Sequence, residues 1–203
     1  MNKLYLQVSG FIFDNIVWKT DELLGPDFML SPHRQSRTPD KSTQEPSLDR
    51  LSQLVKSAAL ELHLQVSDED LTSTLTTQDR HSVRTVERKR KGIETYRRVA
   101  RALAAQSPYS DGELITAIAV ANEMATSTSR RCVFLTRNGM IGLGPGGATE
   151  VGDFCCIFMG ATVPFVVTSG DNGRYRLVGE CYVNGVMYGE LLHQFQPTGI
   201  VLE

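Results

Sequence analysis

The pattern of hydrophobic positions changes twice along the chain. Aliphatic side chains alternate with other residues from Leu4 to Ser9, and the apolar runs Phe11–Phe13 and Ile16–Trp18 follow. Alternation predicts a β-strand, and a run that is apolar on both faces predicts a strand covered on both sides, so we expect a buried strand over residues 3–18. Gly10 interrupts this strand, which predicts a β-bulge at that position.

The middle of the chain has the period of amphipathic helices. After Ser47, which can cap a helix, aliphatic side chains recur every three or four residues from Leu48 to Leu62. Ser110 and Glu113 have the spacing of a capping box, in which each side chain bonds the backbone N–H of the other residue. Four helices are therefore predicted within a helical insertion over residues 48–128; they begin near Ser47, Ser67, His81 and Ser110.

Beyond residue 130 the period becomes two, and glycine-rich turns separate short apolar runs. The predicted strands are Cys132–Thr136, Met140–Leu143, Phe154–Met159, Val163–Thr168 and Tyr175–Val183. Short strands at this spacing are typical of a small β-barrel, which the N-terminal strand would join.

The sequence thus predicts an α+β fold in a single domain, residues 1–203. Residues 1–18 open the barrel, residues 131–203 supply its other strands, and the helical insertion packs over it. Residues 25–47 hold four prolines and show no apolar period, so we expect an exposed, mobile loop there.

Composition narrows the class of protein without indicating a function. Of the 203 residues, 41% are hydrophobic and 22% are charged, which is ordinary for a globular chain and excludes a disordered or collagen-like one. The net charge of −2 gives no global sign of a nucleic-acid partner. The longest apolar run is far shorter than the roughly 18 residues of a membrane span, and the N-terminus has no signal-peptide pattern.

The cysteines favour packing over chemistry. Cys132, Cys155, Cys156 and Cys181 all lie in apolar, strand-like runs, where a thiol usually acts as a small hydrophobic group. No CxxC pair is present and the histidines are scattered, so the spacing does not support a zinc site. We expect buried, reduced thiols in an intracellular protein that holds no metal.

The strand-rich part carries a distinctive series of sequence blocks. In chain order they are Val8–Ile16, Arg131–Thr136, Gly139–Pro145, Val151–Asp153, Pro164–Val167, Tyr175–Gly185 and Gly189–Glu190. Their order and spacing resemble the C-terminal region of fungal heterokaryon incompatibility (HET) proteins. The resemblance implies a barrel fold, a fungal source and a cytoplasmic location.

Two differences from the HET proteins bear on function. Those proteins carry an N-terminal HET domain, similar to Toll/interleukin-receptor domains, which is taken to trigger cell death; this chain begins with Met1 just before the opening strand, so we expect the effector part to be absent. Asn184 also stands where the family usually has His, Tyr188 where it usually has Asp, and Thr168 where a basic residue is common. These departures indicate a retained scaffold with an altered site.

The barrel also resembles stand-alone proteins of fungal biosynthetic clusters, including norbornene-forming Diels–Alderases of diterpenoid pathways, although no motif carries this second resemblance. It implies a cyclase of secondary metabolism that needs no cofactor and takes an apolar, terpenoid-like small molecule, because proximity alone can lower a pericyclic barrier by several kcal/mol. The alternative is a non-catalytic recognition or binding module derived from HET proteins. The cyclase ranks first, since a sensor without an output domain is harder to explain.

Three polar residues, Glu180, Tyr182 and Asn184, alternate along one predicted strand. We expect them to share a face with Val178, directed toward the helical insertion, while Leu177 and its alternate neighbours fill the barrel. As catalytic residues they would hydrogen-bond the substrate; the alternative is that they bond the backbone of the insertion and fix its docking, as buried polar groups usually do. The predicted substrate-binding residues are mostly apolar groups of the barrel strands: Trp18, Asn138, Met140, Phe165, Met187 and Tyr188.

Two further features have plain interpretations beside functional ones. The glycine-rich run Gly142–Gly147 lacks the spacing of a phosphate-binding loop and precedes no helix, which favours a β-loop or lid. Basic residues concentrate between Arg80 and Arg101, which would suit an anionic partner or nucleic acid. We expect a solvated helix face instead, because the rest of the chain is acidic and no nucleic-acid motif is present.

Overall fold

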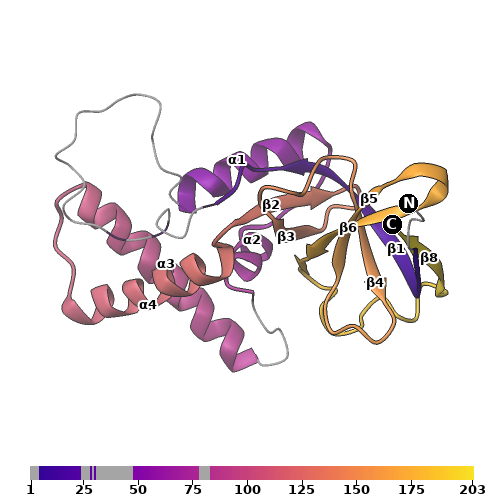
Figure 1. Cartoon of the computed structure of the whole chain (residues 1–203). Helices are drawn as coiled ribbons and strands as arrows, with labels where there is room; N and C mark the ends of the chain where they lie inside the picture. Colours follow the sequence, from indigo (N-terminus) through magenta and orange to yellow (C-terminus); the bar gives the residue numbers. More distant parts are fainter. Residues whose placement is uncertain (1–4, 24–27, 29, 31–47, 78–82) are drawn as a thin grey trace.

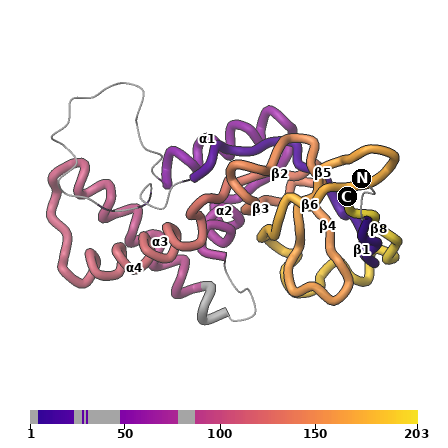
Figure 2. The backbone as a smooth tube through the Cα atoms, in the orientation of Figure 1, coloured from indigo at the N-terminus to yellow at the C-terminus, as the bar shows by residue number. Residues whose placement is uncertain are grey.

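The computed structural model describes residues 5–23, 28, 30, 48–77 and 83–203, with only the backbone at residues 83–86. Both ends of the chain form a β-barrel, and the middle of the chain forms helices that extend away from it (Figure 1). The indigo β1 (Leu6–Lys19) and the yellow C-terminal strand β8 (Thr198–Leu202) lie side by side (Figure 2). The predicted α+β barrel fold is confirmed.

β1 is the strand around which the sheet is built. It pairs antiparallel with β8 over its first half, with β4 (Phe154–Phe158) over its middle, and with β2 (Arg131–Thr136) at its end. Consecutive parts of β1 therefore belong to different surfaces of the barrel. This arrangement explains why the sequence of β1 is apolar on both faces.

Gly10 does not form the predicted bulge. Its register with β4 and β8 is unbroken, and the two extra residues of β1 are Phe13 and Val17. A Cβ atom at Gly10 would lie 2.4 Å from the carbonyl oxygen of Ile157, which no side chain could accommodate. The glycine is required because two backbones approach closely, a demand that a single sequence does not distinguish from a bulge.

Five strands close into a ring: β1, β4, β5 (Phe165–Ser169), β6 (Tyr175–Glu180) and β8. β8 was not predicted, and it closes the ring against β6 through a single parallel pair, Tyr175 with Leu202. Strands β2, β3 (Ile141–Pro145) and β7 (Tyr182–Val183) extend the sheet from β1.

The described helices are α1 (Leu48–Glu61), α2 (Asp68–Leu75), α3 (Val83–Ala104) and α4 (Asp111–Thr128). The predicted capping box of Ser110 with Glu113 is present at the start of α4, and Ser67 forms a second one with Asp70 at the start of α2. None of these helices is long and apolar enough to cross a membrane.

The predicted cap Ser47 and most of the predicted loop 25–47 lie outside the described residues. Phe28, within that stretch, is fully buried. Its carbonyl oxygen accepts a 3.0 Å hydrogen bond from the hydroxyl of Tyr96 on α3, and burial raises the pKa of Tyr96 to about 12. At Phe28, therefore, the chain is anchored to the core.

Three hydrophobic clusters hold the fold together. The largest packs the four helices onto β2, β3 and β7, and we call it the helix–sheet core. The second lies between β1, β4 and β5 on one side and Phe134, Val183 and Val186 on the other, and we call it the second core. The third, the ring core, gathers side chains from all five strands of the closed ring.

Candidate functional site

The predicted polar trio lies where the barrel meets the helices, but its members have different surroundings. Tyr182 is buried in the helix–sheet core, and Asn184 is also buried. Glu180 is exposed to solvent. The chain leaves β6 at Glu180, where it pairs with Phe165, and then re-pairs with Leu143 of β3 through Tyr182.

A bulge in β6 reverses the predicted inside and outside positions of Leu177 and Val178, whereas Cys181 and Val183 are buried as predicted. Val166 pairs with Gly179 and Val167 pairs with Leu177, so Val178 is the extra residue. As a result Val178 packs against the second core, whereas Leu177, predicted to fill the barrel, is 51% exposed. The expectation that Glu180, Val178 and the buried polar residues share one face is therefore wrong.

Asn184 joins the barrel to α2. Its side-chain Nδ2 donates a 2.9 Å hydrogen bond to Oδ1 of Asp70, and its backbone N–H donates to the carbonyl of Ile141. Asp70 is also the residue whose other carboxylate oxygen completes the capping box with Ser67. The carbonyl oxygen of the Asn184 side chain is buried and has no hydrogen-bond partner among the described residues. The contact gives Asn184 a docking role.

The predicted substrate-binding residues are distributed over different parts of the fold. Trp18 and Met187 pack against the helix–sheet core, Met140 against the second core, and Phe165 belongs to the ring core. Asn138 and Tyr188 are exposed. The structure brings Trp18, Met187 and Tyr182 to one core and places the other predicted residues elsewhere.

The cationic residues of α3 divide into two groups. Those of its C-terminal half tie the helices together: Arg97 and Arg101 both pair with Asp49 of α1, and Arg98 pairs with Glu113 of α4. Arg97 also reaches Asp68 of α2, at 3.7 Å. This half of the basic helix is structural.

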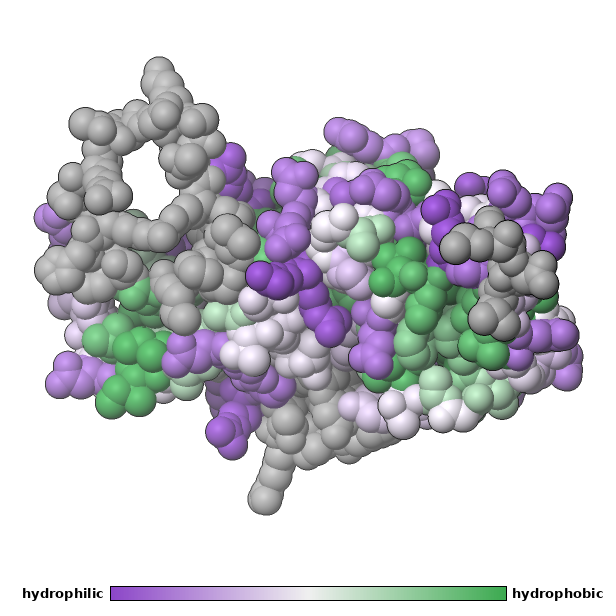
Figure 3. All heavy atoms as spheres, in the orientation of Figure 1, coloured by the Kyte–Doolittle hydropathy of each residue, from purple (hydrophilic) through white to green (hydrophobic). Residues whose placement is uncertain are grey.

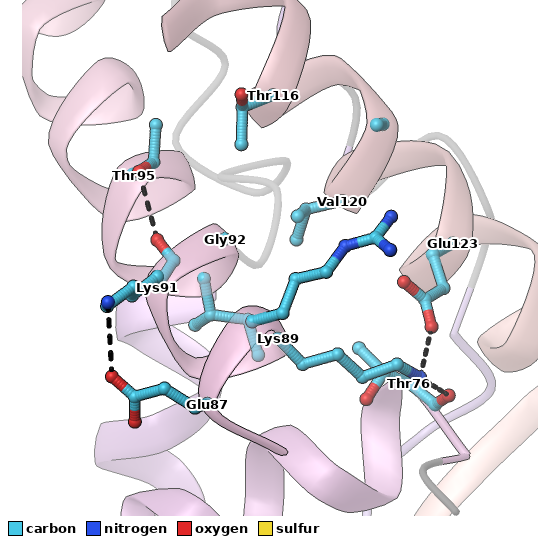
Figure 4. Close-up of a pocket in the computed structure, with 12 residues that line it drawn as sticks. Thr76, Glu87, Lys89, Lys91, Gly92, Thr95, Thr116, Val120 and Glu123 are labelled. Atoms are coloured by element: carbon cyan, nitrogen blue, oxygen red, sulfur yellow. Dashed lines mark hydrogen bonds and ion pairs between the residues drawn. The ribbon is translucent and has the colours of Figure 1, made fainter. Parts of the chain in front are cut away.

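Three cationic residues of the N-terminal half of α3, Arg88, Lys89 and Lys91, border a groove of about 1180 Å³ between α3 and α4. Gly92, Ile93, Ala119 and Val120 supply its apolar surface. Its remaining lining residues are threonines and charged residues, namely Thr76, Glu87, Arg88, Lys89, Lys91, Thr95, Thr116 and Glu123 (Figure 4).

Gly92 sets the separation of the two helices. A Cβ atom at this position would lie 3.0 Å from a methyl carbon of Val120, so the side chain of α4 occupies the space that a larger residue on α3 would need. Glycine costs about 1 kcal/mol relative to alanine inside a helix, and its presence is explained by this close approach.

Most polar groups of the groove already have partners within the protein. The hydroxyls of Thr76, Thr95 and Thr116 each donate to a carbonyl of the preceding helical turn, at 2.9 Å. Their methyl groups therefore add to the apolar surface at no cost in unsatisfied hydrogen bonds. Lys89 reaches across the groove to Glu123, with Nζ 2.5 Å from Oε1 (Figure 4).

Arg88 is the exception among the charged lining residues. Glu87 pairs with Arg90 and Lys91, and the hydrogen bond from Arg90 is the main cause of the lowered pKa of Glu87. Arg88 is exposed and forms no ion pair with any residue that the structure describes. The groove thus has an apolar floor, and the polar groups along its sides are mostly hydrogen-bonded or ion-paired within the protein. Among its described charged residues, Arg88 is the one that remains available to a ligand.

An apolar surface continues from the groove along α4. Ile115 is 68% exposed and Ile118 is 42% exposed, and a hydrophobic patch lies over the N-terminal part of this helix (Figure 3). α4 is apolar on nearly all sides, and such a helix is normally covered on all sides. Two features of the sequence indicate this surface: a glycine within a basic helix and an apolar helix without a polar face.

The four cysteines are buried and none forms a disulfide. Burial raises the pKa of Cys156 to about 12 and also raises that of Cys132 and Cys181. In the part of the chain that the structure describes, no three His, Cys, Asp or Glu side chains come together as metal ligands. Cys155 and Cys181 pack in the second core and Cys156 packs in the ring core, while Cys132 is buried on β2 outside these clusters.

Comparison with known proteins bears on the barrel and on α4. Residues 110–198 match the family model of the Het-6 beta-barrel domain, which confirms the resemblance to HET proteins for this part of the chain. Heterokaryon incompatibility protein 6, OR allele, of Neurospora crassa is 45% identical over 62 residues, which cover 29% of this chain. The match begins one residue before α4, so α4 belongs to the matched region, whereas α1, α2 and α3 lie outside it.

The matched segment covers only 9% of the Neurospora protein. What that whole protein does is therefore not established for this chain. No solved structure matches the chain.

Proposed function

We propose that this chain is a recognition module of the HET barrel type, which binds a polypeptide segment in the α3–α4 groove. The observation that carries the proposal is the groove itself. Small-molecule sites are typically about 300–1,000 Å³, and the groove exceeds that range at about 1180 Å³. It also continues into the exposed apolar face of α4, as a surface for an extended ligand would.

The barrel supports this function as a scaffold. The four described helices pack on β2, β3 and β7 through the helix–sheet core. The Asn184–Asp70 hydrogen bond fixes α2 on the same sheet. A groove held on rigid elements needs little ordering when a ligand binds, and this lowers the entropic cost of association. The match to the Het-6 barrel domain supports a module of this family.

The cyclase hypothesis has less support. The comparisons concern HET proteins, and the structure distributes the residues predicted to surround an apolar substrate over three cores. Asn184, a buried member of the predicted catalytic trio, hydrogen-bonds Asp70 of α2. Cyclisation remains a hypothesis from the sequence.

A random-peptide display selection against the purified chain tests the recognition function. Ala119→Trp places a large side chain in the groove from an exposed position of α4, and Thr126→Trp places the same side chain at an exposed position of that helix outside the groove. We expect selected peptides to bind the wild type and Thr126→Trp but to lose most of their affinity for Ala119→Trp. Thermal unfolding checks that both variants fold.

Two results would contradict the proposal. One is a selection that enriches no peptide above a control with an unrelated bait. The other is a set of peptides that bind Ala119→Trp and the wild type equally, which would place recognition on another surface.

A further inference from the structure

We infer that the ligand of the α3–α4 groove is an acidic, amphipathic helix of a partner protein. This inference rests on the proposed recognition function and adds the chemistry of the partner. It follows from the shape of the apolar surface and from the charges that border it.

The apolar surface has the spacing of a helix-binding site. Ile118 and Ala119 lie three and four residues after Ile115 on α4, so the three side chains form a ridge on its exposed side. The floor of the groove, at Gly92 and Val120, runs beside this ridge. A second helix packs onto such a surface with side chains at i, i+3, i+4 and i+7, as in other helix-in-groove complexes.

The charges select an acidic partner over a neutral or basic one. α3 carries eight basic and two acidic residues. The described carboxylates of the groove, Glu87 and Glu123, are already paired with α3 cations, whereas Arg88 has no described partner and Lys91 is 70% exposed. A ligand carboxylate beside Arg88 would gain a pair without displacing an existing one.

The expected contribution of the charge is modest and that of the apolar face is larger. An exposed ion pair contributes about 0.2–1 kcal/mol, which corresponds to a change in affinity of up to roughly 5-fold. Reversal of the charge adds repulsion, so Arg88→Glu should weaken binding by roughly 10-fold or more. Ile115→Ser should weaken binding of every ligand, because it removes apolar contact without changing charge.

The experiment uses the best helical peptide from the display selection and two redesigned versions of it. In one, the acidic residues outside its apolar face are changed to glutamine; in the other, to lysine. Fluorescence anisotropy measures the affinity of each for the wild type, Arg88→Gln, Arg88→Glu and the control Arg176→Gln, which changes an exposed arginine on β6. Circular dichroism shows whether the peptide is helical when bound.

We expect the selected peptides to be net acidic and helical. They should bind the wild type most tightly, Arg88→Gln less tightly and Arg88→Glu least tightly. The lysine version should bind weakly to the wild type and recover affinity with Arg88→Glu, and Arg176→Gln should have no effect. Selected peptides that are neutral, basic or extended, or that ignore Arg88, would overturn this inference while leaving recognition intact. A selection that yields no binder would overturn the recognition function itself.

Discussion

Replacement of Asn184 by aspartate tests whether this residue fastens the barrel to α2. In the structure Nδ2 of Asn184 donates to Oδ1 of Asp70 over 2.9 Å. Asn184→Asp removes the donor and places a second carboxylate oxygen at that position. Two like charges at this distance repel by roughly 1.4 kcal/mol in bulk water and about 6 kcal/mol at the effective dielectric constant of 20 that suits partly buried pairs. Asp70 is half-buried, so we expect a loss of about 2–4 kcal/mol in the free energy of unfolding.

Asn184→Ala is the matched control. It removes the same hydrogen bond, which contributes about 1 kcal/mol, but it also removes the buried carbonyl oxygen that has no described partner. The two effects partly offset each other, so the free energy of unfolding should fall by about 1 kcal/mol or less. Urea denaturation followed by circular dichroism measures both variants.

The pH dependence gives a second, independent readout. Beside another carboxylate, the pKa of a carboxyl group is raised in the folded state, so the folded form of Asn184→Asp binds more protons than the unfolded form. The destabilisation should therefore be complete at neutral pH and should shrink as the pH falls through the raised pKa. An Asn184→Asp variant as stable as Asn184→Ala at neutral pH, or one whose deficit grows on acidification, would show that the contact with Asp70 is absent in solution.

Three other predictions test the core, the thiols and the helix ion pairs. In Gly142→Ala the new Cβ would lie 2.4 Å from a ring carbon of Phe134, so chemical denaturation should show that the free energy of unfolding falls by more than about 3 kcal/mol. In the control Gly147→Ala the nearest neighbour of the new Cβ is a side-chain oxygen 3.4 Å away, so the free energy of unfolding should hardly change. Cys156, with a pKa of about 12, is almost wholly a thiol at neutral pH, so native protein should react with a thiol reagent only at the rate of unfolding; fast reaction would show that the site opens. Asp49→Asn removes the partner of two arginines, and that carboxylate is 37% exposed, so the free energy of unfolding should fall by only about 0.5–1 kcal/mol. This loss should diminish in high salt, and a loss unaffected by salt would mean that packing, not charge, is disrupted.

The elements of the fold could be predicted from the sequence where local signals decide them. The capping box at Ser110 and the four-residue period after Leu48 predict helices that the structure contains. β8 could not be predicted in this way, because it is a short apolar run that becomes a strand only by pairing with β1 and β6. Its existence depends on residues nearly two hundred positions away.

The site could be predicted less well than the fold, for a geometric reason. A strict period of two placed Val178 beside Glu180 and Tyr182, but the bulge at Val178 and the change of partner after Glu180 separate them. One extra residue in a strand exchanges the two faces of everything before it. Alternation therefore predicts shared faces only within an unbroken ladder, and neither break has a signature in the sequence alone.

The basic helix shows a similar limit for charge. A solvated face and an anionic partner were alternatives for the whole of α3, yet the structure divides the helix between two roles. Its C-terminal arginines are used by Asp49 and Glu113, residues that lie on other helices and could not be assigned to them from sequence spacing. Toward the N-terminus the cations instead border the groove, where Glu87 and Glu123 are satisfied and Arg88 is not. Net charge is thus a poor guide to the surface of this protein, because most of the described cations of α3 are paired with carboxylates, whereas Arg88 lies beside the apolar groove without a described ion-pair partner.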